Sequence, residues 1–253
     1  MTLPVGVEGT SNFAMPPEDN VITMSLTLVI GNKNYSSWSM RPWVLLKQFG
    51  IPFQEVMLKF ESAEWLEHIA RLAPTRKVPT LWDGEAGAST SIAVWESIAI
   101  IEYLADLFPQ IPIWPTDRAP RAMARAVAAE MHAGFRSLRS NMPMNIRSLH
   151  PGKGMQPGVA EDIARIETIW LAAREQFGAH TDAPFLFGQF CAADAMFAPV
   201  VMRFATYQPP LAAASLDYCE AMKAAPGIAA WIDQASHETE FVGFDEPYAS
   251  PPL

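Results

Sequence analysis

The chain has 253 residues, enough for two modest domains or one large one, each with its own core. Half of the residues are hydrophobic and 18% are charged, a balance that excludes disorder of the whole chain. The formal net charge of -9, with no Lys/Arg stripe to override it, repels a phosphate backbone and argues against a nucleic-acid partner.

Residues 1–23 contain three prolines and two glycines but no basic or apolar targeting segment, and they are expected to form a flexible N-terminal extension. The two cysteines, Cys191 and Cys219, follow no secretory leader and belong to no metal-binding motif. Reduced thiols, a cytoplasmic location and the absence of a metal are therefore expected. The longest apolar runs are too short for a bilayer, so no membrane partner is expected.

Residues 24–107 alternate short apolar runs with segments of helical spacing, which predicts a small mixed sheet with helices on its faces. The first expected helix starts at the serines of residues 36–39 and stops before Gly50. The last two expected strands flank a turn-rich stretch and form an antiparallel hairpin. The expected strands are 26–30, 54–59, 78–82 and 91–95, and the further expected helices are 63–72 and 97–107.

Three prolines in residues 108–116 indicate a linker between two domains. Residues 117–240 then show apolar side chains at three- and four-residue spacing, which predicts an all-helical domain. A proline-rich, irregular tail is expected over residues 241–253. The expected helices are 120–149, 158–177, 192–207, 211–225 and 227–238.

Three junctions of the first domain carry side chains suited to binding a peptide. Pro79 opens a strand, and a cis bond there leaves the backbone of the preceding residue free to pair with an extended ligand. Ser36 and Ser37 start one helix, where a hydroxyl and the helix dipole can hold a thiolate. Glu96 and Ser97 start another, where a carboxylate can bind. Each junction alone is most often an ordinary cap or strand start, and their combination is the signal.

This combination resembles the glutathione transferase superfamily over residues 26–238. The stretch from Asn34 to Arg41 is similar to the Ser-Ser-Cys-x-x-Arg motif of the zeta class, which includes maleylacetoacetate isomerases. The resemblance implies an α/β thioredoxin-like N-terminal domain plus an all-α helical-bundle C-terminal domain. It also implies glutathione as co-substrate, a small-molecule electrophile and a homodimer.

In the zeta register the thiol-activating serine corresponds to Ser36, whereas the delta-class register places it at Ser37, and the sequence leaves both open. Trp38 replaces the zeta-class cysteine, which weakens the case for an isomerase. The resemblance further implies two groups of contacts. Those expected to bind glutathione are Lys77, Val78, Pro79, Glu96 and Ser97, and those expected to line the electrophile pocket are Trp38, Met131, Phe135, Arg139 and Met142.

The implied function is transfer of glutathione to a small hydrophobic electrophile, with a serine hydroxyl stabilising the thiolate. The alternatives are a maleylacetoacetate isomerase-like enzyme and a non-catalytic glutathione-fold binding module. A glutathione-dependent reductase or peroxidase requires a cysteine near residues 36–39, and none is present. His132 is expected to have a surface or core role. Cys191 and Asp194 occupy the family's capping box, in which cysteine is a weaker acceptor than a hydroxyl.

Overall fold

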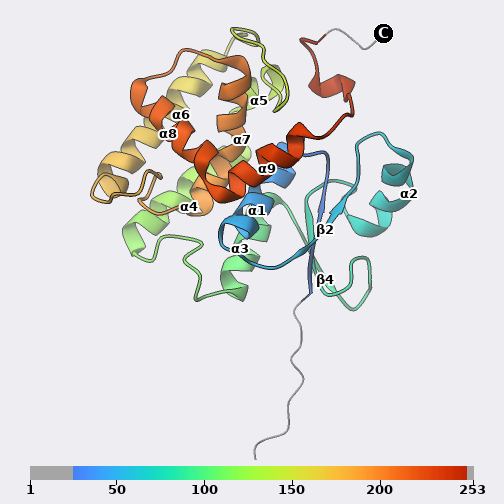
Figure 1. The fold of residues 1–253 in the computed structure, drawn as a ribbon. Helices are drawn as coiled ribbons and strands as arrows, with labels where there is room; N and C mark the ends of the chain where they lie inside the picture. Colours follow the sequence, from blue (N-terminus) through green and yellow to red (C-terminus); the bar gives the residue numbers. More distant parts are fainter. Residues whose placement is uncertain (1–24, 250–253) are drawn as a thin grey trace, which may run out of the picture.

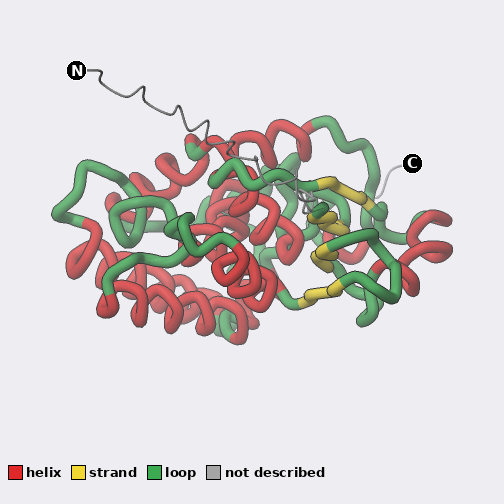
Figure 2. The backbone as a smooth tube through the Cα atoms, turned by 90° about the horizontal axis from the view of Figure 1, so that it is seen from below, coloured by secondary structure: helices red, strands yellow, loops and turns green. Residues whose placement is uncertain are grey.

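The computed structural model describes residues 25–249, and the expected N-terminal extension lies outside them (Figure 1). The described chain begins with an α/β region and continues as a helical region, in the order that the sequence predicts. Viewed from below, the strands gather at one side of the molecule and helices make up the other (Figure 2).

The α/β region contains a four-stranded mixed sheet in the order β2-β1-β3-β4. Strand β1 is parallel to β2 and antiparallel to β3, and β3 and β4 form the predicted hairpin. The strands are β1 (Leu26–Ile30), β2 (Gln54–Met57), β3 (Thr80–Asp83) and β4 (Ile92–Trp95), and the helices are α1 (Ser37–Gln48), α2 (Ala63–Leu72) and α3 (Ser97–Leu107).

Side chains of β1 alternate between two hydrophobic clusters, because successive residues of a strand point to opposite faces of the sheet. Leu26, Leu28 and Ile30 join the large core that contains α1 and α3. Val29 joins a smaller cluster with Ile69 and other residues of α2. Helix α2 therefore covers the outer face of the sheet, while α1 and α3 separate the inner face from the helical region (Figure 1).

Helix α7 runs through the centre of the helical region, and all its residues except Ala205 are buried. It packs against α1, so one hydrophobic core continues from the sheet into the helices. The helical elements are α4 (Arg118–Ala133), α5 (Arg136–Asn141), α6 (Val159–Ala173) with a π-helical turn η1 (Arg174–Gly178), α7 (Ala192–Tyr207), α8 (Ala213–Ala224), α9 (Pro226–Ser236) and a 3-10 turn η2 (Gly243–Asp245).

The single helix expected over residues 120–149 is wrong, because the chain turns between α4 and α5. Gly134 caps α4, and a Cβ atom there would lie only 2.8 Å from the carbonyl oxygen of Glu130. Phe135 has a left-handed backbone with a φ of 57°. The turn at these two residues makes α4 and α5 separate helices. After α5 the chain leaves helical geometry altogether.

The C-terminal segment lies against the loop that connects β1 to α1. The Glu238 carboxylate accepts hydrogen bonds from the backbone N–H groups of Lys33 and Asn34, at 2.6 and 3.0 Å. The Tyr35 hydroxyl donates to the Glu246 carboxylate at 2.7 Å. The segment expected to be an irregular tail therefore contains the turn η2 and helps to hold the chain where α1 begins.

Candidate functional site

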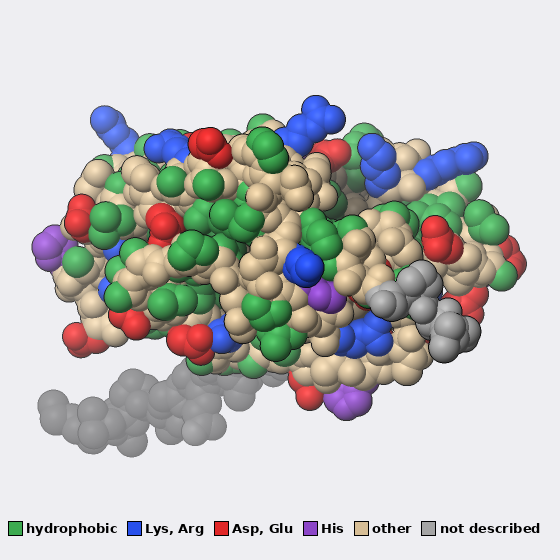
Figure 3. Space-filling view, turned by 90° about the horizontal axis from the view of Figure 1, so that it is seen from above, with side chains coloured by type: hydrophobic (Ala, Val, Ile, Leu, Met, Phe, Trp, Pro, Cys, Tyr) green, Lys and Arg blue, Asp and Glu red, His purple; other side chains and the backbone are tan. Residues whose placement is uncertain are grey.

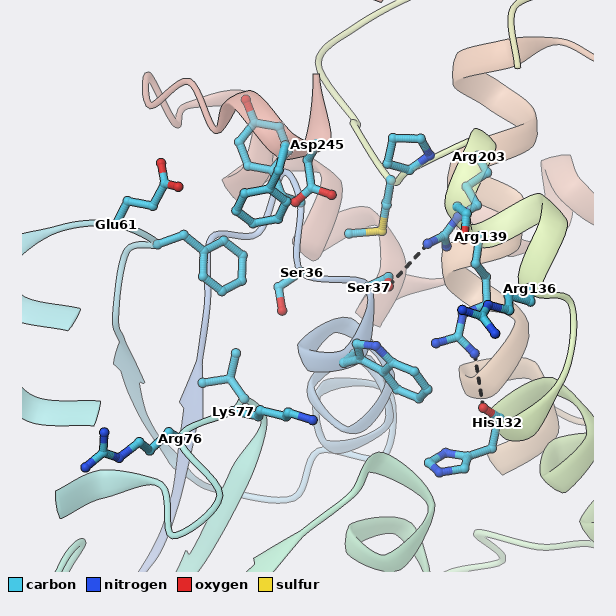
Figure 4. Close-up of a pocket in the computed structure, with 18 of the residues that line it drawn as sticks. Ser36, Ser37, Glu61, Arg76, Lys77, His132, Arg136, Arg139, Arg203 and Asp245 are labelled. Carbon is cyan, nitrogen blue, oxygen red and sulfur yellow. Dashed lines mark hydrogen bonds between the residues drawn. The ribbon is translucent and has the colours of Figure 1, made fainter. Parts of the chain in front are cut away.

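A cavity of about 860 Å³ lies between the α/β region and the helical region, with the C-terminal segment along one edge (Figure 4). The start of α1 forms its floor, and the loops before α2 and β3 form one wall. The end of α4, helix α5 and α7 form the opposite wall. Its lining includes Tyr35, Ser36, Ser37, Trp38, Phe60, Glu61, Trp65, Arg76, Lys77, Val78, His132, Arg136, Arg139, Met144, Arg203, Phe244 and Asp245.

Both candidate serines line this cavity at the N-terminus of α1, but their hydrogen bonds differ. The Ser36 side chain is the N-cap of α1: its Oγ accepts from the backbone N–H of Ser39 at 3.4 Å and donates to the Ser39 hydroxyl at 2.7 Å. The Ser37 Oγ accepts from Nη2 of Arg203 at 3.3 Å. An oxygen that accepts in this way leaves its own hydrogen available for a group in the cavity.

A smaller hollow of about 150 Å³ brings together all five residues expected to bind glutathione: Lys77, Val78, Pro79, Glu96 and Ser97. It shares Trp38, Lys77 and Val78 with the large cavity, so the two spaces adjoin. The Val78–Pro79 peptide bond is cis. The Val78 backbone N–H and C=O form no hydrogen bond with any described residue.

Ser97 is fully buried at the start of α3, and its hydroxyl donates to the backbone oxygen of Trp38 at 2.8 Å. This bond links the start of α3 to the first turn of α1. Glu96 has a φ of 68°, and its carboxylate lies 3.4 Å from Nε2 of His132. The two helix starts are thus tied to each other and to the end of α4.

Arginine side chains surround Trp38 on the helical side of the cavity. The guanidinium of Arg41 lies 4.2 Å from the centre of the indole ring and that of Arg139 lies 4.3 Å from it. Burial lowers the pKa of Arg139 and, most strongly, that of Arg41. Burial, with repulsion from Arg139, lowers the pKa of Arg203 to about 10. Arg139 and Arg203 line the cavity, whereas Arg41 lies outside its lining.

Of the five residues expected to line an electrophile pocket, only Trp38 and Arg139 line this cavity. Met131, Phe135 and Met142 are buried in the hydrophobic core instead. The reason is the turn at Gly134, since a continuous helix would have placed these side chains along one face. His132 lines the cavity and contacts the edge of Trp38, with 5.1 Å between ring centres. Burial lowers its pKa, although Glu96 acts in the opposite direction.

Arg203 and Asp245 line the cavity but were not predicted from the sequence. Arg203 lies in the middle of an apolar helical repeat, and Asp245 lies in the proline-rich tail. Burial raises the pKa of Asp245 to about 7, and Arg203 acts against this rise. No local motif marks either residue, because each reaches the site only through tertiary packing.

Residues 35–107 match the model of the glutathione S-transferase N-terminal domain, and residues 156–234 match that of the C-terminal domain. The chain belongs to the glutathione S-transferase superfamily. The expected fold class is confirmed by these matches and by solved structures of the superfamily.

Curated glutathione S-transferase relatives match a part of the chain. A probable maleylacetoacetate isomerase of Caenorhabditis elegans is 33% identical over 105 residues, which are 41% of this chain and 45% of the relative. Glutathione S-transferase theta-3 of Mus musculus is 31% identical over 97 residues, or 38% of each chain. The match therefore spans less than half the length of either relative.

Solved glutathione S-transferase structures match more of the chain. A glutathione transferase homologue from Burkholderia GL BGR1, with bound glutathione, has a TM-score of 0.60 and 24% identity, over 83% of this chain and 97% of that one. Human glutathione-S-transferase T1-1 has a TM-score of 0.57 and 21% identity, over 83% and 87% of the two chains. At these identities the likeness shows the fold.

Two further observations concern residues 25–249. None of their helices combines the length and hydrophobicity needed to cross a bilayer. Within the same range, no group of three or more His, Cys, Asp or Glu side chains is arranged to hold a metal ion.

Proposed function

We propose that this protein is a glutathione transferase that binds the tripeptide along the two adjoining spaces. The γ-glutamyl end lies in the smaller hollow at Glu96 and Ser97. The cysteinyl backbone pairs with Val78, whose N–H and C=O are unused within the described chain. The sulfur then lies in the large cavity, where α1 begins. The single observation that carries this proposal is that the serines of α1 adjoin the hollow formed by Val78 and Ser97.

The chemistry that this placement supports is stabilisation of the thiolate. A free thiol titrates near a pKa of about 8.5, so only a few per cent is ionised at neutral pH. A hydroxyl that donates to sulfur, together with the positive end of the α1 dipole, favours the charged form. A fall of about two pKa units corresponds to about 2.7 kcal/mol.

We assign the activating role to Ser37, because its hydrogen is free while its oxygen accepts from a cationic side chain. Ser36 instead completes the N-cap and bonds to Ser39. The thiolate then attacks an electrophilic carbon of a small substrate in the large cavity, and the C–S bond of a thioether forms as the bond from that carbon to its leaving group, such as halide, breaks and releases the anion. A homodimer and a cytoplasmic location remain expectations from the family likeness.

One experiment distinguishes the proposed transferase from two alternative functions. The 33% identity to a probable maleylacetoacetate isomerase favours a glutathione-dependent isomerase, although Trp38 occupies the position of the zeta-class cysteine. A non-catalytic glutathione-binding module is the other. Retention on glutathione resin, followed by a panel of aryl halides and a cis-configured enedione, separates the three. A transferase forms conjugates, an isomerase returns the trans isomer and a module does neither.

The role of the serines is tested by titrating the ultraviolet absorbance of the bound thiolate in Ser37→Ala and Ser36→Ala. We expect Ser37→Ala to raise the thiol pKa by about two units and to change glutathione affinity less than threefold. Ser36→Ala is the matched control, and it is expected to lower stability by about 1 kcal/mol through loss of the cap. A raised thiol pKa in Ser36→Ala alone transfers the role to Ser36, and an unchanged pKa in both rejects serine activation.

A further inference from the structure

The helical wall of the cavity carries buried positive charge that no described carboxylate pairs with. Arg203 donates to the backbone oxygens of Met142 and Pro199, at 2.8 and 3.2 Å, and to the Ser37 hydroxyl. Arg139 donates through Nη1 to the backbone oxygens of His132 and Gly134. All of these acceptors are neutral. Neither arginine forms an ion pair with any residue in the described part of the chain.

Arg41 adds to this charge from behind Trp38. It is fully buried, and its Nε donates to the backbone oxygen of Met196 at 3.1 Å. Its Nη1 and Nη2 are buried without a described partner. Guanidinium groups stay charged in proteins, so Arg139 and Arg203 on the cavity wall and Arg41 behind Trp38 make this side of the cavity positive. Burying such groups without a counter-ion is costly, which favours binding of an anion beside them.

The rest of the molecule does not show this concentration of positive charge. The protein as a whole has a formal net charge of -9, and on the face in Figure 3 basic side chains are scattered singly among acidic and apolar ones. Two carboxylates also line the cavity, those of Asp245 and Glu61. Asp245 is near enough to Arg203 for each group to shift the pKa of the other, but no ion pair in the described part of the chain joins either carboxylate to these arginines. Figure 4 shows Glu61 on the far side of the cavity from Arg139.

The carboxylates of glutathione do not account for these arginines under the proposed binding mode. The γ-glutamyl end occupies the hollow at Ser97, and the glycyl end is expected at Lys77. Both lie toward the sheet, whereas Arg136, Arg139 and Arg203 lie on the opposite wall, with the two serines between (Figure 4). The positive wall therefore faces the space left for the second substrate.

We propose that the electrophile of this protein carries a carboxylate, which Arg139 and Arg203 hold so that the reactive carbon faces the sulfur at Ser37. Guanidinium groups bind carboxylates through paired, charge-assisted hydrogen bonds. Trp38, in contact with Arg139, supplies a flat apolar surface for the rest of the substrate. This inference rests on the proposed function and replaces the neutral hydrophobic electrophile expected from the sequence with an anionic one.

The test is calorimetric binding of S-(4-carboxybenzyl)glutathione and S-benzylglutathione, which differ only in the carboxylate. We expect the carboxylate ligand to bind the unaltered protein at least about tenfold more tightly. Arg139→Gln should bring the two affinities within about twofold of each other, while Arg139→Lys should keep part of the preference. Arg118→Gln is the matched control, since it removes the same charge from an exposed position at the start of α4.

Turnover provides a second readout in the unaltered protein. The value of kcat/KM for 4-chloro-3-nitrobenzoate, divided by the uncatalysed rate, should exceed that for the corresponding N-methylamide, chiefly through a lower KM. Equal affinity for the two glutathione derivatives, or a preference that survives Arg139→Gln, overturns the anionic substrate but leaves the proposed function intact. If neither derivative binds, the proposed function fails and this inference fails with it.

Discussion

The two walls of the large cavity use different chemistry. On the α/β side, the loops before α2 and β3 bring charged side chains of both signs, Glu61, Arg76 and Lys77, next to the Val78 backbone, which is unpaired within the described chain. On the helical side, α5 and α7 contribute the guanidiniums of Arg136, Arg139 and Arg203, and the hydrogen bonds of Arg139 and Arg203 go to backbone oxygens and to one serine. The first wall suits an extended peptide, and the second suits a charged small molecule.

The walls also differ in how the chain builds them. The α/β wall comes from junctions where a strand or loop meets a helix, so each junction has its own local signal in the sequence, and tertiary contacts such as the Ser97–Trp38 hydrogen bond bring the junctions together. The helical wall joins residues without such a signal, such as Arg139 of α5 and Arg203 of α7. One hydrogen bond, from Arg203 to Ser37, connects the two walls directly across the proposed sulfur position. The contrast teaches that local motifs mark the α/β wall, whereas only the packed structure reveals the helical wall.

The largest expected effect comes from loosening the helical wall at the base of α7. The buried Asp194 carboxylate accepts from the backbone N–H groups of Cys191 and Leu186 and from the Tyr218 hydroxyl, at 2.9, 3.1 and 3.0 Å. Asp194→Ala leaves all three donors unpaired and should lower the free energy of unfolding by about 3 to 5 kcal/mol in urea denaturation. Asp194→Asn keeps one oxygen acceptor and should lower the free energy of unfolding less than Asp194→Ala does. An equal loss of stability in the two variants would contradict the role given to the carboxylate.

A second prediction concerns the bond that joins the walls. Arg203→Met leaves two backbone oxygens and the Ser37 hydroxyl without their donor and should cost about 2 kcal/mol of stability. It should also raise the pKa of the bound thiol, because Ser37 loses its cationic partner. Arg203→Lys keeps the charge and serves as the control. The pKa of the bound thiol is measured by titrating thiolate absorbance. The same thiol pKa in Arg203→Met and Arg203→Lys would show that the charge of Arg203 does not act on the sulfur through Ser37.

The third prediction addresses the α/β wall alone. Ser97→Ala removes the bond to the Trp38 backbone oxygen and the hydroxyl proposed to meet the γ-glutamyl group. Loss of one such hydrogen bond should raise the KM for glutathione about tenfold, which corresponds to about 1.4 kcal/mol. The KM for the electrophile should change little. Ser97→Thr retains a hydroxyl, so its KM for glutathione should fall between those of the unaltered protein and Ser97→Ala. An unchanged glutathione KM in Ser97→Ala would remove this residue from the proposed site.

The smallest expected effect is on the pH dependence of stability at the edge of the helical wall. Burial raises the pKa of Asp245 from 3.8 to about 7, so the folded state holds its proton more tightly than the unfolded state. Stability should therefore fall as pH rises from about 4 to about 7. Asp245→Asn should remove on the order of 1 kcal/mol of this fall, allowing for partial solvent exposure. Denaturation at pH 5 and pH 8 measures it, and unchanged pH dependence would contradict the assignment.

The sequence was informative wherever the signal was local. Strand β1 and the helices α2, α3 and α7 have the expected bounds, because apolar periodicity and capping residues mark their ends. Pro79, Glu96 and Ser97 lie at junctions that turn and cap chemistry identifies, whereas Lys77 and Val78 were implied by the family resemblance, and all five line one hollow. Their roles in binding, like the domain boundaries, stay predictions.

The sequence failed where packing overrides periodicity. The apolar spacing of residues 120–149 continues past Gly134, yet the backbone turns there, and the side chains of Phe135 and Met142 enter the core. A buried arginine such as Arg203 has no sequence signal either, because the oxygens that satisfy it come from other turns and loops. For this reason the expected pocket contained one arginine, Arg139, whereas the folded wall also carries Arg136 and Arg203.

The contact between Glu238 and the backbone of Lys33 and Asn34 joins segments more than 200 positions apart. During synthesis the loop before α1 is made first, and this hydrogen-bond acceptor is added more than 200 positions later. The loop can form these two hydrogen bonds only after residue 238 has left the ribosome. A product that terminates before residue 238 would therefore lack this acceptor at the start of α1, however well its sheet had formed.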